Sequence, residues 1–341
     1  MSDTSAGGWP FEASPFHRGE RAVQERLGVR ELMEGRARIG MRDFMPEQHR
    51  QFFAQLPLVL VGSVDSGGQP WASVLAAPPG FMQTPDARHL VICARALADD
   101  PLHAHLAVGA HIGLLGIEPH TRRRNRLNGV VVRCEADRFV LRVTQSFGNC
   151  PKYIAAREAV FAGAVDGTPK PQVQRAERLD DAMRAIIERA DTYFLASAFA
   201  GENGEDGEDG EDDGDLVQRG VDVSHRGGKP GFVRIDDEHT LSAPEFVGNN
   251  FFNTIGNLVL NPQAGLLFLD VERGDVLYLA VSAEVVWDGP AVAAFAGAQR
   301  LLRLRIRQAV RVTQSLPLRW GEVTPSPFVA STGIWQAQAR G

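Results

Sequence analysis

The sequence predicts a mainly β fold with some α-helix, arranged as two tandem antiparallel β-barrels with peripheral helices. Short β-branched runs separated by turn residues begin near residue 58. The same order of runs recurs after residue 190. The two halves also end alike, because residues 142–146 and 311–315 both read RVTQS. A repeat on this scale predicts a duplicated unit of about 100 residues.

Composition favours a soluble globular protein. The 341 residues leave room for two domains, with 44% hydrophobic and 23% charged residues. No apolar run approaches the ~18 residues of a membrane span, and the first nine residues lack a secretory h-region. The three cysteines form no CxxC pair, so neither a disulfide framework nor a zinc site is indicated. We therefore expect a cytoplasmic protein with no membrane contact.

Charge is unevenly distributed along the chain. The net charge is −6, but residues 201–215 hold nine acids in a Gly-rich run. Without that run, 36 basic residues face 42 − 9 = 33 acidic ones, a balance of about +3. A mildly basic body suits small anions and is too weak a signal for nucleic acid.

The first half reads as a helical arm followed by strands. Residues 23–33 have apolar residues at helical spacing. Met45-Pro46 ends this helix or starts another, which buries Phe52 and Phe53. Strands are predicted at 58–64, 71–75, 89–93, 112–117, 128–134 and 138–145, with a short helix at 101–108.

The second half repeats this pattern with two additions. Residues 193–198 match 58–63, and Gly265-Leu-Leu matches Gly113-Leu-Leu. The acidic run is predicted to be a disordered insertion, and 291–302 an additional Ala-rich helix. The joining segment has helical spacing in 153–161 and 179–187. The expected domains are an N-terminal helical arm (1–45), a first barrel (46–153), a helical linker (154–190), a second barrel (191–320, with the insertion at 201–215) and a tail (321–341).

One strand end and one helix start carry the clearest binding signal. Residues 222–233 form a strand that ends in a Gly/Pro turn, with Ser224, His225, Arg226 and Lys229. Residues 248–257 begin a helix and are rich in amides and hydroxyls. Its amide and hydroxyl side chains are those of Asn249, Asn250, Asn253 and Thr254. Cations, hydroxyls and a helix N-terminus suit a phosphate. The alternative is a plain hairpin turn with a solvated Lys229.

Residues 121–129 form a second basic cluster. Strand alternation places Arg122, Arg124 and Arg126 on one face, where like charges are costly unless an anion or carboxylates answer them. The alternative is a solvated loop. Cys150, in the turn before Lys152, is either a buried structural thiol or a redox thiol near a cofactor.

These motifs resemble the pyridoxamine 5′-phosphate oxidase-like FMN-binding split-barrel superfamily. The resemblance rests on the runs at 224–232, 251–258 and 261–267, and covers about 45–320. Residues 121–129 and 146–153 resemble signatures of a branch found fused to ferredoxin-reductase modules. The resemblance implies two split β-barrels with FMN between them.

The resemblance also implies which residues hold the phosphate. Lys229 matches the family's strand-end lysine, whereas Ser224 stands where the oxidases have an arginine. Asn253 and Thr254 stand where they have an Arg-Lys pair. These departures count against pyridoxamine phosphate as the substrate and leave Arg226 as a substitute cation. The first copy has Asp99-Asp100 at the matching helix start, where acids repel phosphate.

The function expected from the resemblance is an FMN-dependent oxidoreductase of unknown substrate. The predicted cofactor-binding residues are Ser224, Arg226, Lys229, Asn249, Asn250, Asn253, Thr254, Arg124, Arg126 and Lys152. His225 is the candidate for proton exchange, because an imidazole titrates near neutrality. The alternatives are a flavin or haem carrier or sensor, and an interaction module. A small-molecule substrate and an electron-transfer partner are both open, as are a homodimer and an intramolecular pseudo-dimer.

Overall fold

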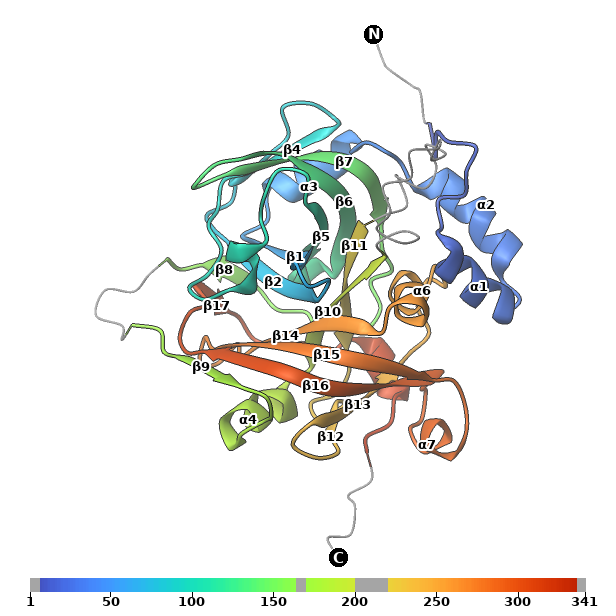
Figure 1. Ribbon diagram of the computed structural model, residues 1–341, viewed down its shortest axis with the longest axis vertical. Helices are drawn as coiled ribbons and strands as arrows, with labels where there is room; N and C mark the ends of the chain where they lie inside the picture. The colour runs from blue at the N-terminus through green and yellow to red at the C-terminus, as the bar shows by residue number, and fades with distance from the viewer. Residues whose placement is uncertain (1–6, 164–169, 200–219, 336–341) are drawn as a thin grey trace, which may run out of the picture.

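The computed structural model describes residues 7–163, 170–199 and 220–335 (Figure 1). Within them the chain forms two large antiparallel sheets with helices at the periphery, which confirms the predicted mainly β class. Both sheets are consistent with split barrels, and neither closes on itself among these residues. The predicted acidic insertion at 201–215 lies outside the described residues.

The first sheet has seven strands in the order β2-β1-β5-β6-β7-β4-β3. Its strands are β1 (Leu58–Val64), β2 (Pro70–Ala76), β3 (Met82–Gln83), β4 (His89–Ile92), β5 (His111–Glu118), β6 (Arg123–Cys134) and β7 (Phe139–Gly148). The predicted strand at 58–64 coincides with β1 because its β-branched and apolar residues are nearly all buried. Asp65 makes the turn to β2, accepting from the backbone N–H groups of Gly67 and Gln69.

The second sheet repeats this order as β11-β10-β14-β15-β16-β13-β12, with β9 added beside β16. Its strands are β9 (Val173–Ala176), β10 (Thr192–Phe199), β11 (Gly220–Gly227), β12 (Arg234–Ile235), β13 (Thr240–Glu245), β14 (Gln263–Leu269), β15 (Val276–Val286) and β16 (Arg300–Val312). Each of the strands β1 to β7 thus has a counterpart in the same place in the second sheet, from β10 for β1 to β16 for β7. The tandem duplication itself stays a prediction.

The helices lie around these sheets (Figure 1). They are α1 (Arg18–Arg26), α2 (Arg30–Gly40), α3 (Glu47–Ala54), α4 (Asp181–Arg189), α6 (Asn253–Leu260) and α7 (Pro290–Ala293), with short 3-10 turns η1 (Pro101–Ala104), η2 (Pro119–Thr121) and η3 (Pro327–Ser331). As predicted, α3 buries Phe52 and Phe53. In the described part of the chain no helix is both long and apolar enough to cross a membrane.

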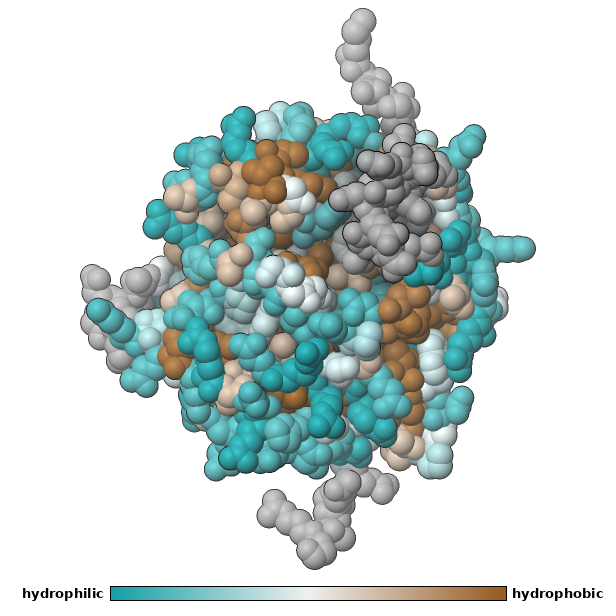
Figure 2. All heavy atoms as spheres, viewed as in Figure 1, coloured by the Kyte–Doolittle hydropathy of each residue, from teal (hydrophilic) through white to brown (hydrophobic). Residues whose placement is uncertain are grey.

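Helix α1 packs closely on α6. A Cβ added at Gly19 would lie 2.2 Å from the carbonyl oxygen of Gly256, so only glycine permits this approach. Figure 2 shows an apolar patch over α6, where Val259 and Leu260 are exposed. The arm therefore supports the helix whose first residues were predicted to bind phosphate.

The two sheets touch backbone to backbone. A Cβ at Gly113 of β5 would lie 2.1 Å from the carbonyl oxygen of Val221, and one at Gly265 of β14 would lie 2.5 Å from that of Pro70. One buried cluster draws on both sheets and includes Leu60, Trp71, Val223, Leu267 and Tyr278. This shared core fixes how β6 and β11 face each other, and thereby the site between them.

Three helix predictions are wrong. The predicted helix at 23–33 is broken, because Gly28 has a φ of 67° and separates α1 from α2. Residues 153–161 instead contain β8 (Ala159–Phe161), which pairs with β17 (Leu318–Trp320). The predicted helix at 291–302 is the single turn α7 before β16 begins. The helix predicted at 179–187 is confirmed by α4.

Candidate functional site

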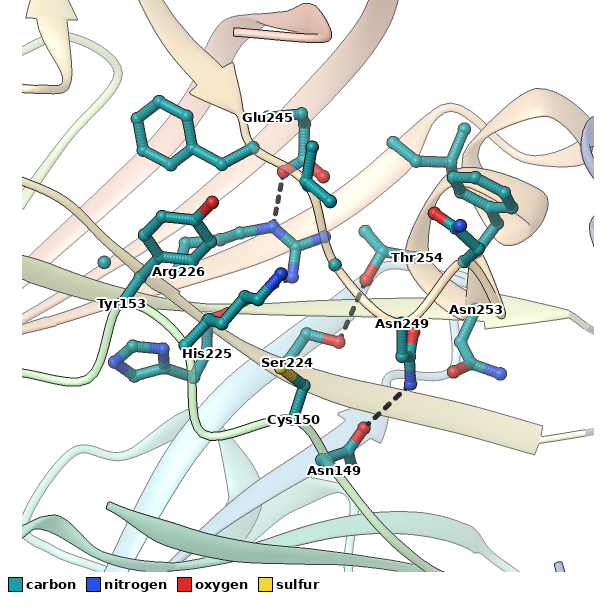
Figure 3. A pocket seen from close by; sticks show the side chains of 18 of the residues that line it. Asn149, Cys150, Tyr153, Ser224, His225, Arg226, Glu245, Asn249, Asn253 and Thr254 are labelled. Carbon is teal, nitrogen blue, oxygen red and sulfur yellow. Dashed lines mark hydrogen bonds and ion pairs between the residues drawn. The ribbon is translucent and has the colours of Figure 1, made fainter. Parts of the chain in front are cut away.

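A pocket of about 260 Å³ lies between the two sheets (Figure 3). The first half contributes β5, β6 and the segment after β7. The second half contributes β11, the end of β13, the loop to α6 and the start of β16. Neither sheet alone forms the walls.

All the residues predicted from the sequence to bind the cofactor, except Lys229, line this pocket. They are Arg124, Arg126, Lys152, Ser224, Arg226, Asn249, Asn250, Asn253 and Thr254, together with the candidate base His225. Lys229 is not in the lining, and its Nζ donates to the carbonyl oxygen of Thr332 at 2.6 Å. Its role in phosphate binding stays a prediction.

Two of the arginines are already paired. Arg226 Nε donates to the carboxylate of Glu245, which raises the pKa of the guanidinium against the effect of burial (Figure 3). Arg126 Nη1 donates to Asp222 Oδ1 at 3.1 Å, and its Nη2 donates to Ser224 Oγ. In both pairs a carboxylate neutralises the buried guanidinium charge.

Arg124 is different, because it has no carboxylate partner among the described residues. Its Nε donates to the carbonyl oxygen of Cys150 at 2.7 Å. Burial, then the neighbouring charges of Arg126 and Arg226, lower its pKa to about 9. It is still charged at neutral pH, so a cation faces the pocket without a neutralising group.

Several buried donors at the pocket also lack acceptors. Among the described residues, Asn149 Nδ2, Arg126 Nε and Arg300 Nε are buried without a hydrogen-bond partner. Asn149 Oδ1 meanwhile accepts from Asn249 at 3.3 Å, and Thr254 Oγ1 donates to Ser224 Oγ at 2.9 Å (Figure 3). Unmade donor bonds are costly, so the pocket is suited to a ligand rich in acceptors.

Asn253 is held by the N-terminal arm. Its Nδ2 donates to the carboxyl of Glu20 on α1. Burial, then the charge of Asp222, raise the pKa of Glu20 well above its ordinary value. Asn253 therefore lines the pocket with its amide already engaged, which sequence order alone does not reveal.

His225 is a neutral imidazole at neutral pH. Burial lowers its pKa well below 6.5, and the nearby guanidinium groups of Arg124, Arg226 and Arg157 lower it further. The expectation of a near-neutral pKa is therefore not met. The burial and the neighbouring cations that lower the pKa also make the ring a weak base, so it stays neutral and can act through hydrogen bonds.

Unusual backbone conformations gather at this pocket. Tyr153, Asn250 and Phe252 all have positive φ, near 61–63°, although none is glycine. Such residues are uncommon and concentrate at functional sites. Phe252 is the residue before α6, so its left-handed turn sets the direction of that helix.

The lining also contains Glu245, Arg300 and Phe246, which were not predicted from the sequence. Glu245 and Arg300 are opposite each other in the β13–β16 ladder. Arg300 also lies over the rings of Phe252 and Trp287, at 5.1 and 5.4 Å from their centroids. Nothing local in the sequence marks either residue, because their meeting depends on strand register.

Comparison with protein families gives one match. Residues 45–163 match the family model described as pyridoxamine 5′-phosphate oxidase. No curated protein sequence matches the chain.

Three of the similar solved structures are distant likenesses. A putative pyridoxamine 5′-phosphate oxidase from Lactobacillus delbrueckii has 14% identity and a TM-score of 0.30, covering 39% of this chain and 94% of that one. A FAD-binding protein from Mesorhizobium loti has 14% identity and a TM-score of 0.25, covering 41% and 97%. The inhibitor of motility from Bacillus subtilis has 9% identity and a TM-score of 0.19, covering 73% and 87%. TM-scores this low do not establish a shared function.

Proposed function

We propose that the chain is a flavoprotein that binds FMN in the pocket between its two sheets, a proposal supported by the match of residues 45–163 to the family model described as pyridoxamine 5′-phosphate oxidase. The observation that carries the proposal is the excess of donors over acceptors there. Arg124 has no carboxylate partner, and Asn149 and Arg300 have unsatisfied donor atoms, among the described residues. A phosphate ester supplies the missing acceptors and the missing negative charge.

The pocket residues fit a flavin phosphate in their chemistry. Arg124, Lys152 and Arg300 add positive charge, whereas Glu245 is the one acidic residue in the described lining and is engaged by Arg226. Thr254 supplies a hydroxyl group at the start of α6, where the helix dipole also favours an anion, and it is hydrogen-bonded to the hydroxyl of Ser224 on β11. We propose that these residues hold the phosphate.

Aromatic residues on the same walls suit a planar ring. The Tyr153 and Phe246 rings lie 5.0 Å apart between centroids, and Phe252 also lines the pocket. Flat aromatic faces bury a ring system at low entropic cost. Residues from both sheets take part, which favours an intramolecular pseudo-dimer over a homodimer.

Within this proposal the protein is an oxidoreductase of open substrate. The bound flavin would supply the redox chemistry. His225, which stays neutral at working pH, would act as a hydrogen-bond donor or acceptor to a group beside it and not as a general base. Arg124 would stabilise negative charge that develops near it, since it has no internal counter-ion among the described residues.

The test is direct titration of the purified full-length protein, stripped of any bound cofactor, with FMN and with riboflavin. FMN fluorescence or absorbance should change saturably, and FMN should bind at least tenfold more tightly than riboflavin, because charge-assisted contacts to phosphate contribute about 1.5–3 kcal/mol. Equal binding of the two would show that the basic pocket does not hold the phosphate. No binding of either would overturn the proposal.

A further inference from the structure

The loop between β13 and α6, residues 246–252, has an unusual backbone conformation and is called the pocket loop below. Asn250 and Phe252 have φ values of 63° and 61°, in the left-handed region, although neither is glycine. Such conformations persist only where the surrounding structure holds them. Both residues line the pocket between the sheets. The contacts that hold this loop therefore also hold one wall of the pocket.

The contacts of the pocket loop with the two sheets leave one residue to be fixed. At its end, Phe252 lies under the guanidinium group of Arg300, 5.1 Å from the ring centroid. In its middle, Asn249 Nδ2 donates to Asn149 Oδ1 at 3.3 Å, which is longer than the usual range. Phe251 lies between the two left-handed residues, and neither of these contacts involves it.

The N-terminal arm holds Phe251. Gln24 on α1 is fully buried, and its Nε2 donates to the carbonyl oxygen of Phe251 at 3.1 Å. The Phe251 ring packs edge to face on Phe16, with 5.2 Å between the centroids, and lies 6.0 Å from the ring of Phe147 on β7. One short segment from the start of the chain thus contacts both the backbone and the side chain of Phe251.

The same segment is tied to α6, beside which α1 lies (Figure 1). The carboxyl of Glu20 accepts from Asn253 Nδ2 at the start of α6. A Cβ added at Gly256 would lie 2.6 Å from the backbone nitrogen of Glu20, so no space is left between the helices. Undocking of α1 would therefore release Asn253 and Phe251 together.

The arm packs largely on itself. One apolar cluster contains Trp9, Phe16, Met33, Ala37 and Met41 from the arm, with Phe147 from β7 and the partly buried Phe251. Units with few apolar contacts to the rest of a protein open locally at a lower free energy than its core. Opening of the arm can therefore be measured separately from global unfolding.

We propose that Gln24 is a positioning residue for the pocket and that α1, with the residues just before it, is a clamp on the pocket loop. When docked, it holds Phe251 and thereby the left-handed residues on either side. An arm that docks on the formed loop and a ligand that binds the formed pocket favour each other, because coupling between two sites is reciprocal. The clamp itself stands on the contacts of the arm, whereas its coupling to a ligand rests on the proposed binding of FMN.

The clamp is tested without ligand, by hydrogen exchange of the full-length protein read by mass spectrometry. Gln24→Met keeps a side chain of similar length and removes the donor. Exchange at residues 249–256 should become about fivefold faster, as the net loss of one hydrogen bond implies. Phe16→Leu, which removes the ring contact with Phe251, should act in the same direction.

The matched control is Trp9→Phe. It removes a hydrogen bond of the same kind inside the arm, from Trp9 Nε1 to the carbonyl oxygen of Ala13 at 2.8 Å, and leaves Gln24 and Phe251 unaltered. Exchange at residues 249–256 should match the wild type. Unchanged exchange in folded Gln24→Met, or equal acceleration in Trp9→Phe, would overturn the positioning role of Gln24 whether or not FMN binds.

The coupling is tested in the wild type. No residue of α1 lines the pocket, yet FMN at about ten times its dissociation constant should slow exchange in α1 about tenfold by mass action. Helix α4 has the same length of nine residues, also lies outside this lining, and should be unaffected. Slower exchange in the pocket loop with none in α1 would overturn the coupling while FMN binding stands. Absence of FMN binding would instead overturn the proposed function, and the variants above would still decide the clamp.

Discussion

Two sites between the sheets occupy equivalent positions. One contains the cation Arg126, and the other contains the phenol Tyr278 and the acid Asp100. In the first sheet, Leu60 pairs with Leu115 and Leu115 with Arg126. In the second, Phe194 pairs with Leu267 and Leu267 with Tyr278. Arg126 and Tyr278 therefore hold matching places.

The strands that face them match as well. Ser73 lies opposite Val61 in the β1–β2 ladder, and Ser224 lies opposite Leu195 in the β10–β11 ladder. Arg126 reaches Ser224 across the interface. Tyr278 reaches Asp100, which also accepts from Ser73 at 2.5 Å. One frame thus carries two versions of the same contact.

The two sites differ in whether their polar groups all have hydrogen-bond partners. The site around Ser73, Asp100 and Tyr278 is called the closed site, and the site around Ser224 and Arg126 the open site. Ser73 and Tyr278 donate to Asp100, which also accepts from the backbone N–H of Leu102, and all three side chains are at most 2% exposed. The site around Ser224 instead adjoins an open pocket with spare donors. A homodimer would be obliged to keep both sites alike. A single chain with both sheets can close one and keep the other for a ligand.

Removing the Arg126 cation from the open site should have the largest effect on the free energy of unfolding. Arg126→Leu leaves Asp222 buried without its positive partner, so the free energy of unfolding should fall by about 3–5 kcal/mol. Urea unfolding measures this. The double variant Arg126→Leu/Asp222→Asn should recover most of the loss. A fall below about 1 kcal/mol in the single variant would mean that the amides of Asn128 and Asn257 suffice for Asp222.

The closed site should show itself in the pH dependence of stability. Burial raises the pKa of Asp100 to about 6, so the folded protein holds this proton more tightly than the unfolded chain, where the ordinary pKa is 3.8. The resulting stabilisation is complete below about pH 4 and is lost as pH rises to about 6. Asp100→Asn mimics the protonated form.

This variant should therefore be more stable than wild type above pH 6, by about 2–3 kcal/mol for a shift of roughly two pKa units. Urea midpoints between pH 4 and 8 test this, with Asp99→Asn, at the neighbouring acid, as the matched control. Parallel pH profiles for wild type and Asp100→Asn would show that Asp100 does not titrate in this range.

Most of the frame could be predicted from the sequence because it depends on local pattern. The run at 58–64 is β1, and residues 179–187 fall almost wholly in α4. Residues 153–161 have helical spacing, yet β8 forms there because β17 offers a partner strand. Tertiary pairing overrides propensity at such places.

The candidate site could be predicted only where its residues adjoin one another in sequence. Ser224, His225 and Arg226 share one strand and line the pocket together. Glu20 reaches Asn253 from the other end of the chain, and Arg300 meets Glu245 through register. Lys229 lies in the turn after this strand, where its side chain donates to the carbonyl oxygen of Thr332. These contacts depend on how distant parts of the chain pack together, which local sequence patterns do not specify.

The open site should lose its ligand when its unpaired cation is removed. Arg124→Ala should weaken FMN binding about tenfold or more, because a charge-assisted contact contributes about 1.5–3 kcal/mol. Lys229→Ala tests the other phosphate position, which the sequence predicts at the strand end; if the ammonium group bonds only the carbonyl of Thr332 outside the lining, the dissociation constant changes little. Fluorescence titration measures both. The opposite ranking would move the phosphate toward the turn at residues 227–231.

The smallest effect is expected from the closed site. Tyr278→Phe removes only the hydroxyl that donates to Asp100 at 2.9 Å, while the ring remains packed in the core shared by the sheets. The carboxyl keeps Ser73 and the N–H of Leu102, so the free energy of unfolding should fall by about 1 kcal/mol. FMN affinity should stay within about twofold of wild type, because this site lies outside the pocket lining. A large loss of FMN affinity with so small a change in stability would mean that the two sites are coupled through the interface, and that the closed one supports ligand binding in the other.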